Sequence, residues 1–443
     1  MQGKEILKSI SNLIEQDRET LLESLRVFLK MKSIAAQNLG MQKTAEYLVS
    51  AMQDIGLDAR LLTLEGAFPA VFGEYQPPGA TRTLLIYGHY DVQPVEPLDL
   101  WHSDPFGAEI RDGRIYSRGA TDDKGNLWAT LMAFKLLKEL KSGVPIHLKF
   151  FFEGEEEVGS PNLRSYLEAY RDLLAADYTI MCDRGVHESG RPQMYLGNKG
   201  IMSAEIEIEG PSRDVHSGQA PLIGNPAWQL VRALASLKDR ADRILIPGYY
   251  DEVAPPSDED MKLLRNIPFD EKEFLSAYGL KETLPGTGGL QALIHLLYSP
   301  TATINGLSSG YQGRGTKTII PSRASTKLDF RFVMRQDPRV CAAAIKQFFE
   351  ERLDGCRGFT LSMTEPVNPH KMNPAEPIVE VARRCAARTY GREAVVWPLL
   401  DGSGPMAYFG DILGAPAMII GLGAPFAYAN THAPNEYIGV EDY

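Results

Sequence analysis

Four strand-like apolar runs in this sequence are each followed by side chains that can bind a metal ion or transfer a proton. The runs are 83–87, 147–152, 178–182 and 417–420, and the side chains after them are His89, Asp91, Glu156, Glu157, Asp183 and, beyond a loop, His432. In open α/β sheets, ligand sites form at the carboxyl ends of the strands. We therefore expect these side chains to meet at one edge of a sheet.

The segment 118–125 offers two further carboxylates, Asp122 and Asp123, between glycines and just before the apolar segment 127–140. Taken alone it is typical of a capped turn, because Thr and Asp are favoured at helix starts. Its place beside the expected sheet edge makes it a second source of ligands.

A site with two His, several carboxylates and no Cys suits zinc, manganese or cobalt. A carboxylate that gives one oxygen to each of two ions would hold them about 3.5–4 Å apart, where they can activate water and polarise a carbonyl group. A separate carboxylate must then accept the proton of the water and pass it to a leaving amine. Glu156 and Glu157 are adjacent, so one can face the metals and the other the substrate.

Apolar runs and helical stretches alternate up to about residue 202 and again after residue 371, which indicates a mostly parallel sheet flanked by helices. Between them, 203–210 alternates between Glu and Ile as a half-exposed strand does. The order strand-helix-strand-strand-helix-strand then predicts an inserted ferredoxin-like α+β domain, with 240–300 as a helical insertion. We expect a discontinuous catalytic domain, 1–202 and 371–443, and an inserted lid or dimerisation domain, 203–370.

The 443 residues include 57 acidic and 46 basic side chains, a net charge of −11, which argues against nucleic acid or an anionic membrane as partner. Four cysteines without a CxxC pair favour a reducing cytoplasm. The first residues are amphipathic rather than typical of a secretory signal, and we find no membrane-spanning run. We expect a cytoplasmic protein.

The segments 88–94, 119–125, 153–160 and 432–436 resemble, in order, the motifs of the co-catalytic zinc exopeptidases. This family includes carnosinase, cytosolic nonspecific dipeptidase, carboxypeptidase G, aminoacylase, and the acetylornithine and succinyl-diaminopimelate deacylases. The resemblance covers essentially the whole chain and is greatest to the dipeptidase branch, which also carries a long insertion.

The resemblance implies a role for each motif residue. Asp122 would bridge two metal ions, most simply Zn²⁺ with Mn²⁺ or Co²⁺ as alternatives, and a cis peptide bond would follow it. The remaining ligands would be His89 and Asp183 on one ion, and Glu157 and His432 on the other. Glu156 would act as general base and acid, and Asp91 would orient His89.

The resemblance also implies residues outside the metal site. His216, in the inserted domain, would reach the active site of a second subunit and stabilise the oxyanion, which predicts a homodimer. Arg331 would bind the substrate carboxylate, although a surface ion pair with Asp329 is nearly as good an interpretation from sequence alone. Gly402 and Ser403 would form a small-residue loop near the substrate.

Two departures from the dipeptidase pattern concern the substrate. Asn305 stands where carnosinase-like members often have His, and Leu400-Asp401 replaces the Glu-Gly before the small-residue loop. If that Glu reads a free substrate amine, Asp401 must replace it or the specificity differs.

Together these observations predict a dinuclear metallopeptidase that hydrolyses the amide bond of a dipeptide or similar small substrate with a free C-terminal carboxylate. Carboxypeptidase or N-acyl-amino-acid deacylase activity is the alternative within the family. A catalytically silent relative that binds peptide or metal is the alternative from another class, although such a protein has no need of Glu156. Structural Ca²⁺ sites are a third, disfavoured by two His ligands.

Overall fold

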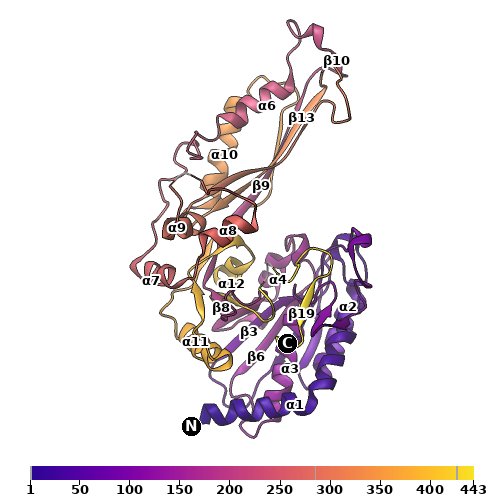
Figure 1. Ribbon diagram of the computed structural model, residues 1–443, viewed down its shortest axis with the longest axis vertical. Coiled ribbons are helices and arrows are strands. Elements are labelled where there is room, and N and C mark those ends of the chain that lie inside the picture. Colours follow the sequence, from indigo (N-terminus) through magenta and orange to yellow (C-terminus); the bar gives the residue numbers. More distant parts are fainter. Residues whose placement is uncertain (1, 285, 426–427) are drawn as a thin grey trace.

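The computed structural model describes residues 2–284, 286–425 and 428–443, which form two stacked parts (Figure 1). We call the eight-stranded sheet with its flanking helices the main body. We call β9, β11, β13 and β14 with helices α6 and α10 the upper layer. Both termini lie in the main body.

The sheet of the main body has the strand order β1-β2-β6-β3-β7-β18-β8-β16. Its central strands β6, β3, β7 and β18 are parallel, whereas β1, β2 and β8 join it by antiparallel pairing. The bounds are β1 Asp58–Leu62, β2 Ala70–Tyr75, β3 Thr83–His89, β6 His147–Glu153, β7 Tyr178–Cys182, β8 Gln193–Tyr195, β16 Val395–Trp397 and β18 Ala417–Ile420. The predicted α/β class with a parallel centre is confirmed, with antiparallel edges that the sequence did not indicate.

Helices cover both faces of this sheet, which explains the run of three phenylalanines in β6. Phe150 and Phe152 pack with α1, α2 and α3, and Phe151 packs on the other face with α4 and α12. Successive side chains of a strand point to opposite faces, so an uninterrupted apolar strand requires two covered faces. The helices of the main body are α1 Gln2–Leu29, α2 Met41–Asp54, α3 Lys124–Glu139, α4 Leu163–Ala169, α5 Arg171–Leu174, α11 Pro377–Tyr390 and α12 Met406–Leu413.

The upper layer is an antiparallel sheet in the order β11-β13-β9-β14, with α6 and α10 on one face. Ile206 and Ile208 are buried against these helices, and Glu205 and Glu207 lie on the opposite face, as the alternation in the sequence indicates. The bounds are β9 Gly197–Glu209, α6 Pro226–Ala235, β11 Thr301–Ser309, β13 Arg323–Phe332, α10 Pro338–Arg352 and β14 Thr360–Met363. The strand-helix-strand-strand-helix-strand order is therefore present, and β9 begins six residues earlier than the expected 203.

The helical insertion packs mainly on the main body. It contains α7 (Asp258–Asn266), α8 (Glu271–Ala277) and α9 (Leu290–Tyr298). Leu264, Leu293 and Leu297 bury their side chains with Val395 and Leu399 of the main body. Part of the range 203–370 therefore packs on the main body rather than within the upper layer.

Short elements complete the chain and connect the two parts. Strands β15 (His370–Lys371) and β17 (Leu400–Ser403) pair with the first residues of β9 where the chain passes between the parts. Strands β4 (Glu109–Arg111), β5 (Arg114–Tyr116) and β19 (Tyr437–Gly439) form a small sheet. At the far end of the upper layer, β10 (Val215–His216) pairs with β12 (Ile319–Ile320). None of the described helices has the length and apolarity needed to cross a bilayer.

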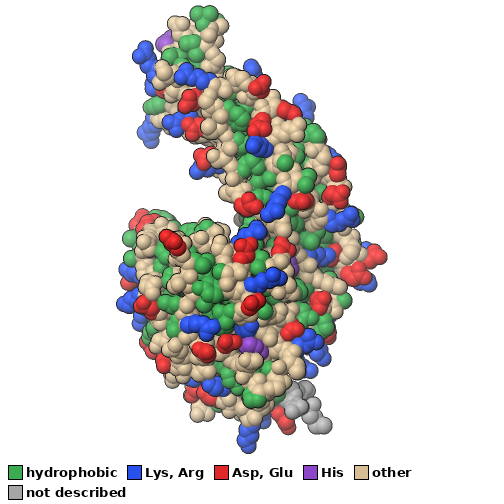
Figure 2. Space-filling view, turned by 180° about the vertical axis from the view of Figure 1, so that it is seen from behind, with side chains coloured by type: hydrophobic (Ala, Val, Ile, Leu, Met, Phe, Trp, Pro, Cys, Tyr) green, Lys and Arg blue, Asp and Glu red, His purple; other side chains and the backbone are tan. Residues whose placement is uncertain are grey.

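The space-filling view shows a hollow between the upper layer and the main body (Figure 2). The open face of the upper sheet, without helices, carries polar side chains such as Glu205, Lys327 and Arg331.

Candidate metal centre

Asp122 lies between two groups of potential metal ligands. One group is His89, Asp122 and Asp183 and the other is Asp122, Glu157 and His432, with the ligand atoms of each group within 4.8 Å of one another. Oδ1 of Asp122 is 3.1 Å from Nε2 of His89, and Oδ2 is 3.0 Å from Nε2 of His432. Each oxygen of this carboxylate therefore faces a different histidine.

The fold positions these residues at one edge of the main sheet. His89 is the last residue of β3, Asp183 follows β7, and Glu157 follows β6 in the 3₁₀ turn Glu156–Val158. His432 comes from the loop after β18. Because these four strands are parallel neighbours, their carboxyl ends meet. Asp122 approaches from the turn before α3, and the Asp122–Asp123 peptide bond is cis.

Asp91 links the two sides of the site. Its carboxylate oxygen Oδ1 is 3.3 Å from Nδ1 of His89, and that nitrogen is also 3.1 Å from the Asp91 carbonyl oxygen. The same carboxylate accepts hydrogen bonds from the backbone N–H groups of Glu156 and Glu157, at 3.2 and 3.0 Å. Asp91 thus holds both the His89 ring and the turn that carries the two glutamates.

Glu436 shapes the segment that carries Asp122. Its buried carboxylate accepts hydrogen bonds from Arg118 at 2.7 Å and from the backbone N–H groups of Gly119, Thr121 and Asp122 at 2.9–3.1 Å. Four donors on one carboxylate fix the turn, because the backbone N–H groups of residues 119, 121 and 122 all point to it. Sequence reasoning missed this role, although Glu436 stands at the end of a motif that it identified.

Asp123 also has a structural contact. Its Oδ2 accepts a hydrogen bond from the backbone N–H of His89 at 3.2 Å, so it ties the start of α3 to the end of β3. A Cβ atom at position 88 would lie 2.7 Å from this oxygen, which explains why the residue before His89 is Gly88. Asp123 therefore holds the backbone of His89 in place.

The site concentrates negative charge out of water. Burial, together with neighbouring carboxylates, raises the pKa of Asp183 to about 7 and raises the pKa values of Asp123 and Glu156. Hydrogen bonds to Asp122 and Glu157 raise the pKa of His432 to about 10. Such a cluster is stabilised when cations neutralise it.

One buried atom tests whether a metal ion fits. Oε1 of Glu157 is buried and has no hydrogen-bond partner among the described residues, while Oε2 accepts from Gln93 at 2.8 Å and lies 3.2 Å from His432. A buried carboxylate oxygen without a donor is costly unless a cation contacts it. The imidazole and carboxylate donors of both groups are those that Zn²⁺, Mn²⁺ and Co²⁺ accept.

Glu156 is placed differently from Glu157. Its backbone is held by Asp91, but within the described chain no hydrogen bond engages its carboxylate. It lies near His89, Asp122 and Asp183 without belonging to either ligand group, and burial raises its pKa. A carboxylate in this position is free to exchange a proton with a molecule bound at the site.

The remaining predicted residues lie apart from the metal ligands. Arg331 on β13 donates to Oγ of Ser403 at 2.8 Å, next to Gly402, and its Nε is 3.7 Å from Asp329, the partner of the surface ion pair that the sequence also allowed. Its contact with a substrate carboxylate stays a prediction. Asn305 is exposed at an irregularity of β11. His216 is exposed on β10, at the opposite end of the upper layer from β3 (Figure 1), so this chain does not bring it to its own metal ligands.

Lys199 is a buried cation that sequence reasoning did not single out. It is 2% exposed, and its ammonium group donates to the carbonyl of Ser299 at 2.9 Å. It lies opposite Ser403 in the pairing of β17 with β9, and on the same face of the upper sheet as Arg331. Burial lowers its pKa to about 8, with Asp401 opposing the shift. The only early signal was its polar type in a glycine-flanked segment.

An α/β fold with parallel central strands and a centre of two imidazoles and several carboxylates defines a candidate metal-dependent hydrolase. Residues 85–443 match the peptidase family M20/M25/M40. The β-Ala-His dipeptidase of Rattus norvegicus is 30% identical over 383 residues, which cover 85% of this chain and 77% of that protein. The chain therefore belongs to this peptidase family.

Further relatives agree. The Cys-Gly metallodipeptidase of Candida albicans is 30% identical, covering 74% of this chain and 71% of its own length. Among solved structures, an M20 family metallo-carboxypeptidase from Sulfolobus solfataricus is 37% identical with a TM-score of 0.89, over 96% of this chain and 95% of that chain. Human carnosine dipeptidase 1 is 26% identical with a TM-score of 0.81, over 99% and 96%. The predictions of the family, its dipeptidase branch and the peptidase class are confirmed.

Proposed function

We propose that this protein is a dinuclear metallopeptidase that hydrolyses dipeptides or similar small amides with a free C-terminal carboxylate. The observation that carries the proposal is the position of Asp122, whose two oxygens face two separate groups of ligands. Relatives named as β-Ala-His and Cys-Gly dipeptidases support the substrate class.

In this proposal His89, Asp122 and Asp183 hold one divalent ion, and Asp122, Glu157 and His432 hold the other. Zn²⁺ suits the two imidazoles best, with Mn²⁺ and Co²⁺ as alternatives. Bound ions would lower the pKa of water and polarise the carbonyl group of the scissile amide. Two imidazole ligands disfavour Ca²⁺.

The chain itself supplies the proton transfer. Glu156 takes a proton from the attacking water and delivers it to the nitrogen of the leaving amine. Asp91 fixes the positions of Glu156 and His89 relative to each other, because its carboxylate contacts the backbone N–H of Glu156 and the ring of His89. Asp123 and Glu436 hold the backbone around Asp122 during this exchange.

Arg331 and Ser403 are the proposed contacts of the substrate carboxylate, with Gly402 giving the backbone room to approach. Their mutual hydrogen bond of 2.8 Å holds the guanidinium beside β17, which pairs with the first residues of β9 at the junction between the upper layer and the main body. Asn305 lies further along the open face of the upper sheet and would contact only a longer substrate.

His216 would act in a second subunit. Its position at the far end of the upper layer supports a homodimer in which the residues 203–370 form the lid and dimerisation domain and the rest of the chain forms the catalytic domain. The imidazole would donate a hydrogen bond to the oxyanion formed at the substrate carbonyl. Four free cysteines support a location in the cytoplasm.

Carboxypeptidase or N-acyl-amino-acid deacylase activity is the second candidate. Leu400 is buried in the apolar core, and Asp401 is exposed and close enough to Lys199 to affect the pKa of that lysine. A Leu at this position cannot bind a substrate ammonium group, which favours substrates without a free amine. The metallo-carboxypeptidase from Sulfolobus solfataricus supports this reading.

Replacement of Glu156 by Gln tests the mechanism. We expect hydrolysis of a dipeptide panel and of N-acetyl amino acids to fall about 10²–10⁴-fold, because general acid–base catalysis contributes that much. Metal content, measured by mass spectrometry, should not change, because Glu156 belongs to neither ligand group. Undiminished turnover, or loss of metal, would contradict the assigned role.

A further inference from the structure

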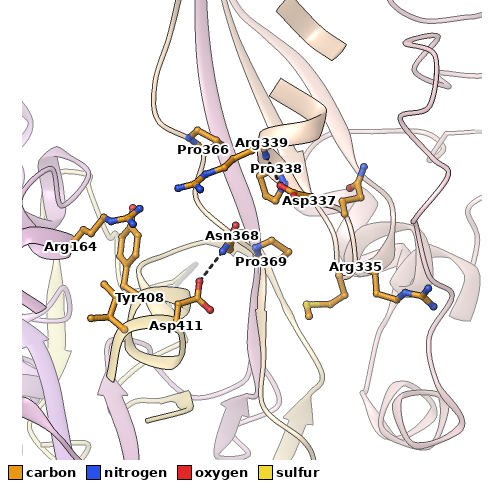
Figure 3. A pocket seen from close by; sticks show the side chains of 13 residues that line it. Arg164, Arg335, Asp337, Pro338, Arg339, Pro366, Asn368, Pro369, Tyr408 and Asp411 are labelled. Atoms are coloured by element: carbon orange, nitrogen blue, oxygen red, sulfur yellow. Dashed lines mark hydrogen bonds between the residues drawn. The ribbon is translucent and has the colours of Figure 1, made fainter. Parts of the chain in front are cut away.

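A cavity of about 450 Å³ lies where the upper layer meets the main body, away from the metal ligands. Arg164, Tyr408 and Asp411 of the main body line one side, and Arg339 and Pro338 at the start of α10 line the other (Figure 3). This volume is within the range of small-molecule sites and exceeds the space that a single simple ion needs.

The walls of the cavity are held in place by contacts of their own. Gln336 is buried and fixes the turn before α10 through hydrogen bonds to the backbone of Val333 and Tyr249, at 2.9 and 2.7 Å. Asp337 caps α10 by accepting from the N–H of Arg339. On the floor, Asn368 donates to Asp411 at 2.8 Å. The lining is therefore largely pre-formed.

The lining offers both signs of charge to a ligand. Arg339 pairs with Glu365 through Nη2 at 3.5 Å, and Arg164 uses its Nε on Glu168 at 2.9 Å. Among the described residues, no other acidic side chain pairs with either arginine, and both guanidinium groups lie beside the cavity (Figure 3). Arg335 is turned the other way. Asp411 binds Asn368 through Oδ2, and among the described residues no donor contacts Oδ1.

We propose that this cavity binds a zwitterionic α-amino acid, with its carboxylate between Arg164 and Arg339 and its ammonium group on Asp411. The rings of Tyr408, Pro338 and Pro366 would contact an apolar side chain. A simple anion would satisfy the arginines but would meet the negative charge of Asp411. An amino acid matches both signs, and a carboxylate is the partner that a guanidinium binds in a forked geometry.

Such a ligand would connect α4 and α12 of the main body with α10 of the upper layer. The cavity borders residues 366–369, where the chain returns from the upper layer to the main body. Occupancy would therefore restrain the upper layer relative to the metal site. Free amino acids are products of peptide hydrolysis, so regulation by product rests on the proposed function, but binding to the cavity does not.

Glu365 acts in this proposal as an internal competitor. Its exposed carboxylate pairs with Arg339, and it is one of the groups that raise the pKa of Arg164, after the hydrogen bond and charge of Glu168. Removing its charge frees the guanidinium groups for a ligand. Replacing Glu365 by Gln should therefore tighten binding, whereas loss of Arg339 should weaken it.

Calorimetry with leucine on the metal-loaded protein tests the proposal. An Arg331→Ala background removes the proposed carboxylate contact at the metal site, so that the cavity is measured alone. We expect Arg339→Ala and Asp411→Asn each to weaken leucine binding about tenfold, as loss of a hydrogen bond to a charged group does. Glu365→Gln should strengthen it. Arg357→Ala is the matched control, because Arg357 is equally exposed, also pairs with a glutamate (Glu209 at 3.9 Å), and lies outside the cavity.

The ligand's two charges are tested with leucinamide, which lacks the carboxylate, N-acetyl-leucine, which lacks the ammonium group, and inorganic phosphate. All three should bind at least about tenfold more weakly than leucine. If N-acetyl-leucine or phosphate bound as tightly as leucine, the cavity would be a general anion site and the proposal of an amino acid site would be wrong. Equal affinities of the Arg339→Ala and Arg357→Ala variants, or no leucine binding at all, would overturn the proposal.

Discussion

At the scale of single residues, the position of Asp122 depends on a side chain more than 300 positions away. Glu436 accepts from the N–H of Asp122 across a sequence separation of 314, and from Arg118 across 318. These contacts explain how the acidic turn 118–125 is held in place beside the other candidate metal ligands. Gln93 likewise holds the side chain of Glu157, by a hydrogen bond across a sequence separation of 64.

Replacing Glu436 by Gln should therefore destabilise the protein. The change leaves the buried Arg118 guanidinium without its counter-charge, and breaking a buried ion pair costs about 3–5 kcal/mol. Denaturant unfolding measures the loss. Glu441→Gln is the control, because its pair with Arg18 is exposed and should contribute under about 1 kcal/mol. Equal small losses in both variants would show that Glu436 does not organise the turn.

The convergence of the candidate ligands at the strand ends was predictable for a physical reason, and the contacts that support them were not. His89, Asp183 and Glu157 follow apolar runs that can only be central parallel strands, so their convergence follows from strand direction. Glu436 and Lys199 act on backbone groups of segments distant in the sequence, and no local pattern specifies such partners. His216 and Arg331 came from family resemblance alone.

At the scale of elements, β9 explains how the two parts share one strand. Its first residues pair with β15 and β17 of the main body, and its later residues form the centre of the upper sheet. The sequence indicated only the later half, because Glu and Ile alternate there, whereas 197–200 is buried on both sides and shows no alternation. The antiparallel strands β1, at the edge of the main sheet, and β2 beside it were also missed, because short strands carry little periodicity.

Lys199 on β9 should affect the pH dependence of stability. Its pKa is about 8 in the folded protein, against about 10.4 in an unfolded chain. Between these values the unfolded state binds more protons, so stability should rise with pH. Relative to a Lys199→Met variant, the wild type should gain up to about 3 kcal/mol from pH 7 to pH 10. Unfolding of both proteins across this range measures the difference, and a constant gap would contradict the low pKa.

At the scale of the whole molecule, β10 lies far from the candidate metal ligands of the same chain. The upper layer extends away from the main body beyond the hollow (Figure 2), and β10, which contains His216, lies at its far end (Figure 1). In the proposed two-fold dimer, this end of the upper layer would lie over the other subunit.

Subunit complementation tests this arrangement. His216→Ala and Glu156→Gln should each be nearly inactive as homodimers. After co-refolding of equal amounts, each mixed dimer has one site with an intact Glu156 and an intact partner histidine. Activity should then recover to about a quarter of wild type, as random pairing into two-fold dimers requires. Failure to recover, although size analysis shows mixed dimers, would place His216 outside the partner's site.

The central claim is that Asp122 is shared by two metal ions, and anomalous diffraction from crystals grown with Zn²⁺ tests it most directly. We expect two peaks about 3.5–4 Å apart, one on each side of the Asp122 carboxylate. The first should lie beside His89 and Asp183, and the second beside Glu157 and His432. A single peak, or peaks that do not touch Asp122, would contradict the account.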